Sequence, residues 1–304
     1  MATPTALSVV QLLTGTFNPT SSNVLEKTMG IQHSNPITPD YTAIKTKQNA
    51  AWSSGDYSRI GAMLQLTGEQ LAERANLAPG STVLDVAAGN GNATLAFARR
   101  LCTVTSTDYV PTLLGRGKAR AQAEGQDITF QVADAEDLPF ADASFDAAAS
   151  SFGVMFTPNQ EQAARELVRV VRPGGTIALA NWTPDGFIGQ LFKTLGKHVP
   201  PPAGVKSPAL WGDAQWLDDR FGAHAETIDI VQRDFVFRHF TPASFVEFFR
   251  TFYGPMHKAF LAVGETGANA LQDDILALIA QFNLAEDDTM HVPSAYAEVI
   301  ITKG

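Results

Sequence analysis

The segment of residues 83–100 constrains the fold of this chain more than any other. Residues 83–86 are apolar except for Asp85, which is typical of a strand buried on both faces of a parallel sheet. The small-residue turn Ala87-Ala88-Gly89-Asn90-Gly91 follows, and residues 92–100 have a helical pattern. Small side chains let the backbone approach a ligand closely, and the first turn of a helix offers unpaired amide groups. The segment therefore predicts the first strand, a ligand-binding loop and a helix of a doubly wound sheet.

A loop of this kind binds either a dinucleotide or S-adenosylmethionine, and its spacing distinguishes the two. Dinucleotide loops follow the pattern G-x-G-x-x-G, but here Thr94 stands where the third glycine is needed. The carboxylate of Asp85 would also repel a pyrophosphate, whereas it suits a ligand that carries an amino group and a sulfonium. The sequence therefore favours S-adenosylmethionine, and an NAD(P)-dependent oxidoreductase remains the alternative.

Polar residues that follow three later apolar segments support the same ligand. Asp108 is placed to accept both ribose hydroxyls, as an acid does at this strand end. Asp134 is placed to accept from the adenine amino group, and the amide of Ala135 to donate to a ring nitrogen. Near Ser151, a backbone carbonyl is placed to meet the methionine amine. Together with the loop, these positions predict a binding edge at the carboxyl ends of neighbouring strands.

These motifs together resemble the class I S-adenosylmethionine-dependent methyltransferases, and within them the small-molecule branch that includes the ubiquinone and menaquinone C-methyltransferases. The resemblance covers residues 80–182 and rests on four motifs: Asp85-x-Ala87-x-Gly89-x-Gly91, Asp134-Ala135-Glu136-x-Leu138-Pro139-Phe140, Ser151-Phe152-Gly153 and Arg172-Pro173-Gly174-Gly175. It implies that S-adenosylmethionine is the cofactor and that the following residues bind it: Asp85, Ala87, Gly89, Asn90, Gly91, Asp108, Tyr109, Asp134, Ala135 and Ser151. Many members have glycine at the position of Ala87. Alanine is tolerated there if its φ is negative, and we expect a negative φ for Ala87. Residues outside the matched region show no signature of the quinone enzymes, so their substrate is not carried over.

The resemblance implies an α/β fold with a doubly wound, Rossmann-like sheet of seven strands, the last of them antiparallel. We expect the strands at residues 83–86, 103–107, 128–132, 144–152, 176–182, 227–237 and 295–302. The chain divides into an N-terminal arm at 1–39, a helical cover at 40–79, a methyltransferase core at 80–240 and 291–304, and a helical lid insertion at 241–290. Within the cover, Ser53-Ser54-Gly55-Asp56 predicts a break between helices.

Methyl transfer asks little of side chains, because the sulfonium is already activated and the enzyme mainly aligns the acceptor and excludes water. A general base is required only for a weakly acidic phenol, alcohol or carbon acid. His257 is the first candidate for that base and His198 the second, and Tyr253 is placed to orient a substrate hydroxyl. Packing roles explain these three residues as well. We predict transfer to oxygen in preference to nitrogen or carbon, with a non-catalytic S-adenosylmethionine-binding protein as a further alternative.

Aromatic and sulfur-containing side chains at the same edge of the sheet are expected to form the acceptor pocket. The candidates are Phe152, Met155, Phe156, Trp182 and Phe187. On the helical cover, Trp52 and Tyr57 are expected to contact the cofactor, with Tyr57 donating to the methionine carboxylate. Simple packing of the cover helices explains both residues equally well. Such a pocket favours a small-molecule acceptor that is planar or apolar.

Composition restricts the partners and the location. With 31 Asp and Glu against 22 Lys and Arg, the net charge is −9 and there is no basic stripe, which argues against a nucleic-acid substrate. The single cysteine, Cys102, excludes an intrachain disulfide and a thiolate metal site, and no metal is expected. No run approaches the ~20 apolar residues of a membrane span, and the first thirty residues lack the basic start of a secretory signal. We therefore expect a cytoplasmic enzyme, and an oligomer is left open.

Overall fold

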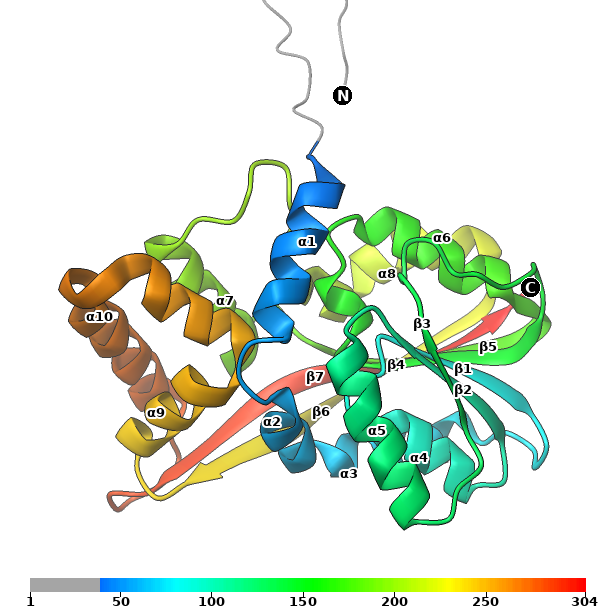
Figure 1. The fold of residues 1–304 in the computed structure, drawn as a ribbon, viewed down its shortest axis with the longest axis horizontal. Helices are drawn as coiled ribbons and strands as arrows, with labels where there is room; N and C mark the ends of the chain where they lie inside the picture. The colour runs from blue at the N-terminus through cyan, green and yellow to red at the C-terminus, as the bar shows by residue number, and fades with distance from the viewer. Residues whose placement is uncertain (1–38) are drawn as a thin grey trace, which may run out of the picture. The chain divides into compact units, whose positions relative to one another are not determined.

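The computed structural model describes residues 39–304, all of which lie within one compact unit. The predicted N-terminal arm, residues 1–39, therefore lies outside the described residues apart from Pro39. Figure 1 shows the arrangement of the helices and strands of the described part.

One mixed sheet forms the centre of the described residues. Its seven strands are β1 (Thr82–Val86), β2 (Thr103–Asp108), β3 (Thr129–Val132), β4 (Phe145–Ser151), β5 (Val171–Trp182), β6 (Ala225–His239) and β7 (Met290–Lys303). They lie in the order β3-β2-β1-β4-β5-β7-β6. The first five are parallel, and β7 runs antiparallel to both β5 and β6. The predicted fold class is thus confirmed, and the strand order reverses beside β1, where ligands bind in such sheets.

Helices cover both faces of the sheet (Figure 1). One layer consists of α3 (Gln65–Ala75), α4 (Asn92–Arg99) and α5 (Pro111–Ala123), and the other contains α6 (Gln160–Val170) and α8 (Ala214–Phe221). The buried strands β1 and β4 are apolar or small along almost their whole length, as a sheet covered on both faces requires.

The predicted helical cover contains α1 (Tyr41–Trp52), α2 (Tyr57–Met63) and α3, of which α3 also belongs to the layer on the sheet described above. The predicted break is present at residues 53–56, where Asp56 ends the turn and caps α2 by accepting from the amide of Ser58. Asp40 caps α1 in the same way, through the amide of Ala43. No residue of α1 is fully buried, so this helix is held mainly by contacts along one side.

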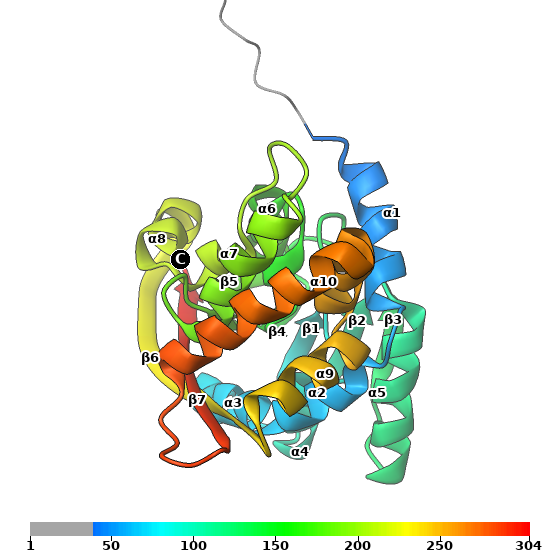
Figure 2. The same cartoon turned by 90° about the vertical axis from the view of Figure 1, so that its left-hand side faces the viewer.

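The segment between β6 and β7 contains α9 (Pro242–Phe252) and α10 (Gly254–Phe282). Gly264 interrupts α10 with a φ of +63°, so this helix is kinked there. Both helices gather with α7 (Phe187–His198) at one end of the β6–β7 pair, and Figure 2 shows α10 passing close to α1. This places the predicted lid next to the helical cover.

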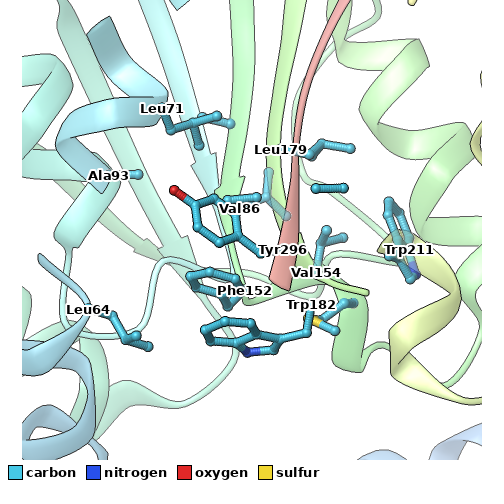
Figure 3. Close-up of a cluster of buried hydrophobic side chains, with 14 of the residues drawn as sticks. Leu64, Leu71, Val86, Ala93, Phe152, Val154, Leu179, Trp182, Trp211 and Tyr296 are labelled. Atoms are coloured by element: carbon cyan, nitrogen blue, oxygen red, sulfur yellow. The ribbon is translucent and has the colours of Figure 1, made fainter. Parts of the chain in front are cut away.

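Aromatic side chains fill the core beneath the carboxyl ends of β4 and β5. Figure 3 shows Phe152, Trp182 and Tyr296 together, and the rings of Phe152 and Trp182 stack with their centroids 4.0 Å apart. Tyr296 is buried but satisfies its hydroxyl by donating to Gln70, 2.9 Å away. The cluster fixes the end of β4 against β5 and β7.

Membrane-spanning helices and metal sites can be examined only within residues 39–304. No helix in this range is both long enough and apolar enough to cross a bilayer. The same residues also bring together no group of three side chains suited to a metal ion.

Candidate functional site

A cavity of about 900 Å³, open solvent at its mouth included, lies over the carboxyl ends of β1, β2 and β4 and beneath α1. Eleven of the twelve predicted cofactor residues line it: Trp52, Tyr57, Asp85, Ala87, Gly89, Asn90, Asp108, Tyr109, Asp134, Ala135 and Ser151. Gly91 does not line the cavity. It is the N-cap residue of α4 and has a φ of +84°. Phe152 and Phe156, which were expected in the acceptor pocket, also line this cavity.

The backbone of the glycine-rich loop departs from expectation at Ala87. Its φ is +53°, so the expected negative φ is wrong. Phe152, across the cavity, also has a positive φ, of +57°. The two loops approach so closely that a Cβ atom on Gly153 would lie 2.0 Å from the carbonyl oxygen of Ala87. This close approach requires glycine at position 153, and two strained non-glycine residues flank the ligand-binding edge.

Asp85 has one carboxylate oxygen that no protein group satisfies. Its side chain is only 1% exposed, and Oδ2 accepts from the hydroxyl of Thr94 at 2.5 Å. The other oxygen, Oδ1, is buried without a hydrogen-bond partner. Burial raises the pKa of Asp85 to about 7, because desolvation disfavours the charged form. A buried acceptor of this kind is suited to a cationic or hydrogen-donating ligand.

Asp108 holds the glycine-rich loop in place in addition to facing the cavity. Its Oδ2 accepts from the amide of Gly89 at 2.9 Å, and its Oδ1 accepts from the amide of Val110 at 2.8 Å. Burial raises the pKa of Asp108 to about 6 despite these hydrogen bonds. Each carboxylate oxygen can accept a second hydrogen bond, so the expected contacts to two ribose hydroxyls are compatible with these partners. The sequence indicated the ligand role and not the structural one.

Lys45 was not among the predicted site residues, and it spans the cavity. Its Nζ lies 2.6 Å from Oδ2 of Asp134 and 3.0 Å from Oε2 of Glu136. Burial acts to lower the pKa of Lys45, but hydrogen bonds to these two carboxylates outweigh it and the pKa is raised. Nearby on α1, the amide of Asn49 donates to the carbonyl of Tyr109 at 2.7 Å. The contacts fasten α1 over the expected adenine position.

The spacing of the cavity-facing residues of α1 in the sequence could have indicated that they share one face of the helix. Positions 45, 48, 49 and 52 recur every three or four residues, so they share one face of the helix. Trp52 belongs to this face, and its ring packs edge-to-face against Tyr57 and Phe156. Tyr57 lies over the glycine-rich loop, and a Cβ atom on Gly89 would be 3.5 Å from its ring. Burial and the nearby Asp108 raise the Tyr57 pKa, so its hydroxyl stays protonated and can donate.

The three predicted catalytic side chains lie outside this cavity. His257 has Nδ1 3.1 Å from the carbonyl oxygen of Arg250, and His198 pairs through Nε2 with Asp274 at 2.9 Å. Tyr253 is buried and packs edge-to-face on Trp52, and burial raises its pKa. The geometry places no part of these residues at the ligand-binding edge.

Of the five predicted pocket residues, three belong to the core of the described structure. Met155, Trp182 and Phe187 are almost completely buried. They line neither this cavity nor a second, adjoining cavity that is described below. Met155 lies in the short 3₁₀ helix η1 (Val154–Phe156), and only Phe156 of that helix faces both cavities.

A second, larger cavity adjoins the first. It measures about 2560 Å³ including its open mouth, and it is bounded by α1, α7, the segment 199–208 and α10. Four residues line both cavities and form the wall between them: Gln48, Trp52, Phe156 and Thr157. The wall is held together by the amide of Gln48, which donates to the carbonyl of Phe156 at 3.1 Å. The carbonyl oxygen of the Gln48 side chain, in contrast, is buried without a partner.

The first cavity fits the expected cofactor. Its glycine-rich loop leaves the space beside β1 free of side chains, and the unpaired Oδ1 of Asp85 offers a position for an ammonium group. A pyrophosphate at the same point would meet a buried carboxylate instead. The residues therefore suit S-adenosylmethionine better than a dinucleotide.

Comparison with known proteins agrees with this geometry. The sequence matches the family described as methyltransferase domain over residues 84–179. An uncharacterized protein of Mycobacterium tuberculosis strain H37Rv is 37% identical over 252 residues, which cover 81% of this chain and 92% of that protein. A demethylmenaquinone methyltransferase of Deinococcus radiodurans is 35% identical over 154 residues, covering 49% of this chain and 64% of that protein.

A solved structure supports the fold. The YcgJ protein of Bacillus subtilis matches with a TM-score of 0.54 at 18% identity, and the match covers 78% of this chain and 99% of that one. At this identity, the likeness shows that the two chains share a Rossmann-like architecture.

Proposed function

Since the chain belongs to the class I S-adenosylmethionine-dependent methyltransferases and uses that cofactor, we propose that it methylates an oxygen atom of a small apolar acceptor. The membership decides against the dinucleotide-dependent oxidoreductase. One observation carries the proposal: a large apolar cavity shares the wall of Gln48, Trp52, Phe156 and Thr157 with the cofactor cavity. An acceptor in the larger cavity would meet the methyl group at this wall.

The residues of the first cavity bind and orient. Asp85 would accept from the cofactor's ammonium group through Oδ1, and Asp108 from its ribose hydroxyls. When bound, S-adenosylmethionine supplies an electrophilic methyl group, whose bond to sulfur breaks as the bond to the acceptor forms, with the electron pair remaining on sulfur. The aromatic wall residues Trp52 and Phe156 would exclude water from that point, which leaves alignment as the main source of rate enhancement.

The wall between the cavities disfavours carbon as the acceptor atom. None of its four residues is a titratable base. An acidic hydroxyl or a carboxylic acid needs none, because it loses its proton to water near neutral pH. A neutral amine needs none either, whereas a carbon acid does, so the wall disfavours only carbon. The preference for oxygen over nitrogen is the order predicted from the sequence. The proposed mechanism therefore assigns no proton transfer to His257, His198 or Tyr253.

A matched set of acceptors tests the proposal. The purified protein is incubated with S-adenosylmethionine and 1-naphthoic acid, 1-naphthylamine or 1,4-naphthoquinol, which share one planar apolar body and differ in the acceptor group. We expect S-adenosylhomocysteine to form with the naphthoic acid and the product to be its methyl ester by mass spectrometry. Methylation of the amine alone, or of ring carbon, would contradict oxygen transfer. Formation of no product, by a protein that binds S-adenosylhomocysteine, would contradict a planar apolar acceptor.

A further inference from the structure

Lysine side chains surround the larger cavity. Five of the nine lysines in the chain line it: Lys47, Lys193, Lys197, Lys206 and Lys258. No aspartate or glutamate is among the lining residues, although the chain contains 31 acidic residues and carries a net charge of −9. A cation-rich and acid-free lining in an acidic protein is a local feature that the overall charge does not explain.

The lysines come from four separate parts of the chain. Lys47 lies on α1, Lys193 and Lys197 lie one turn apart on α7, Lys206 precedes the short helix η2 (Pro208–Gly212), and Lys258 lies on α10. Of these five lysines, only Lys206 forms an ion pair within the described residues, and its partner is Glu161. The other four lysines of the cavity are exposed, and none of them pairs with an acidic side chain within the described residues. They are therefore available to a ligand.

The walls between these lysines are apolar. Phe192 and Leu195 of α7, Val199 after it and Leu261 of α10 all face the cavity, and Leu261 is 61% exposed. The methylene stems of the lysines extend this apolar surface while their charged ends stay at the mouth. A ligand that matches both features has an extended apolar body and a negatively charged group.

We propose that the larger cavity binds an anionic amphiphile, with its apolar body between α7 and α10 and its carboxylate or similar anionic group among the lysines. The inference deepens the proposed function, on which it rests, by giving the acceptor class: an apolar molecule that carries a negative charge. The charge also explains how such a molecule reaches an acidic protein, because the lysines attract it to this cavity.

Binding of a simple amphiphile tests the inference without turnover. The full-length protein, saturated with S-adenosylhomocysteine, is titrated calorimetrically with sodium decanoate and with 1-decanol, which have the same chain length and differ in charge. We expect decanoate to bind at least ~10-fold more tightly than decanol, the size of effect that a small cluster of unpaired cations gives. The preference should shrink between 50 and 500 mM NaCl, since exposed charges are screened.

Matched variants locate the charge. In the double variant Lys193→Gln, Lys197→Gln, the preference for decanoate should fall toward 1, and folding should be unaffected because both side chains are exposed. The control is Lys118→Gln, which removes an exposed lysine of α5 outside the cavity. Equal affinity for decanoate and decanol in the wild type, or an unchanged preference in the double variant, would overturn the inference. Binding to anionic phosphatidylglycerol vesicles without binding of monomeric decanoate would overturn it in favour of a membrane-docking surface.

Failure of the inference and failure of the proposed function give different results. If 1-naphthoic acid is methylated but decanoate binds no better than decanol, the lysines give no preference for an anion and the inference alone is wrong. If decanoate binds as expected but none of the three naphthalene acceptors is methylated, the cavity holds an anion and the proposed acceptor chemistry is wrong.

Discussion

The buried carboxylate of Asp85 predicts that cofactor affinity depends on pH near neutrality. Burial raises its pKa to about 7, whereas the expected partner is an ammonium group that binds only the ionised form. With that pKa, about 9% of Asp85 is ionised at pH 6 and about 91% at pH 8. The affinity for S-adenosylhomocysteine should therefore rise about tenfold, or about 1.4 kcal/mol, over this interval.

Asp108 contributes a smaller part of the same effect. Burial raises its pKa to about 6, so its ionised fraction rises only from about one half to nearly all between pH 6 and pH 8, a factor of about two. Calorimetric titrations of the wild type and Asp85→Asn at the two pH values separate the contributions, because asparagine keeps an oxygen for Thr94 and does not titrate. Asp142→Asn, at a surface position, is the control.

The same pKa fixes the sign of a stability change in the protein without ligand. The folded-state pKa of Asp85 lies above its ordinary value of 3.8, so its contribution to stability is fully present below pH 4 and is lost as the pH rises through 7. The free energy of unfolding should fall over this interval less steeply in Asp85→Asn than in the wild type. Wild-type affinity that is unchanged between pH 6 and 8, or a tenfold rise retained in Asp85→Asn, would refute the reasoning.

Three further substitutions test the loop and the cover. Gly153→Ala places a Cβ atom 2.0 Å from the carbonyl oxygen of Ala87 and should lower the free energy of unfolding by about 1–3 kcal/mol, whereas Gly115→Ala, with open space around it in α5, should raise it by about 0.5–1 kcal/mol. Thermal melts of both compare the two positions, and equal shifts would contradict the close approach. Lys45→Met removes the ion pairs that fasten α1 over the cavity, which are worth about 0.5–1 kcal/mol, so S-adenosylhomocysteine should dissociate about two- to fivefold faster. Stopped-flow tryptophan fluorescence measures this rate, and an unchanged value would mean that α1 does not control release.

The sheet and the cofactor edge could be predicted because their signals are local. The glycine-rich loop and the acids at or just after the ends of β1, β2 and β3 are each short sequence signals, and parallel strands bring their carboxyl ends to one edge. Eleven of the twelve residues expected at the cofactor line the cavity there for this reason. Whether each of them contacts the cofactor stays a prediction.

Features that depend on contacts between distant segments could not be predicted in the same way. The positive φ of Ala87 occurs where Gly153 approaches it closely, and local sequence does not reveal this contact. Lys45 reaches Asp134 across 89 positions of the sequence. Trp182 was expected in a pocket because it ends a strand, but the ring of Phe152 stacks on it and buries it in the core. The choice between pocket and core is decided by such packing.

The lysine cluster illustrates the same limit. Its members lie between positions 47 and 258 on four separate segments, and in the sequence they are isolated charges without a basic stripe. Only the packing of α1, α7 and α10 around one cavity brings them together. Net charge therefore described the whole surface correctly and gave no information about this mouth.

A crystal structure of the complex with S-adenosylhomocysteine tests the central claim most directly, because it locates both ends of the ligand. The account predicts the homocysteine amino group within hydrogen-bonding distance of Oδ1 of Asp85, the ribose on Asp108, and the sulfur facing the wall of Gln48 and Phe156. A ligand bound without contact to either carboxylate, or with its sulfur directed away from the larger cavity, would contradict it.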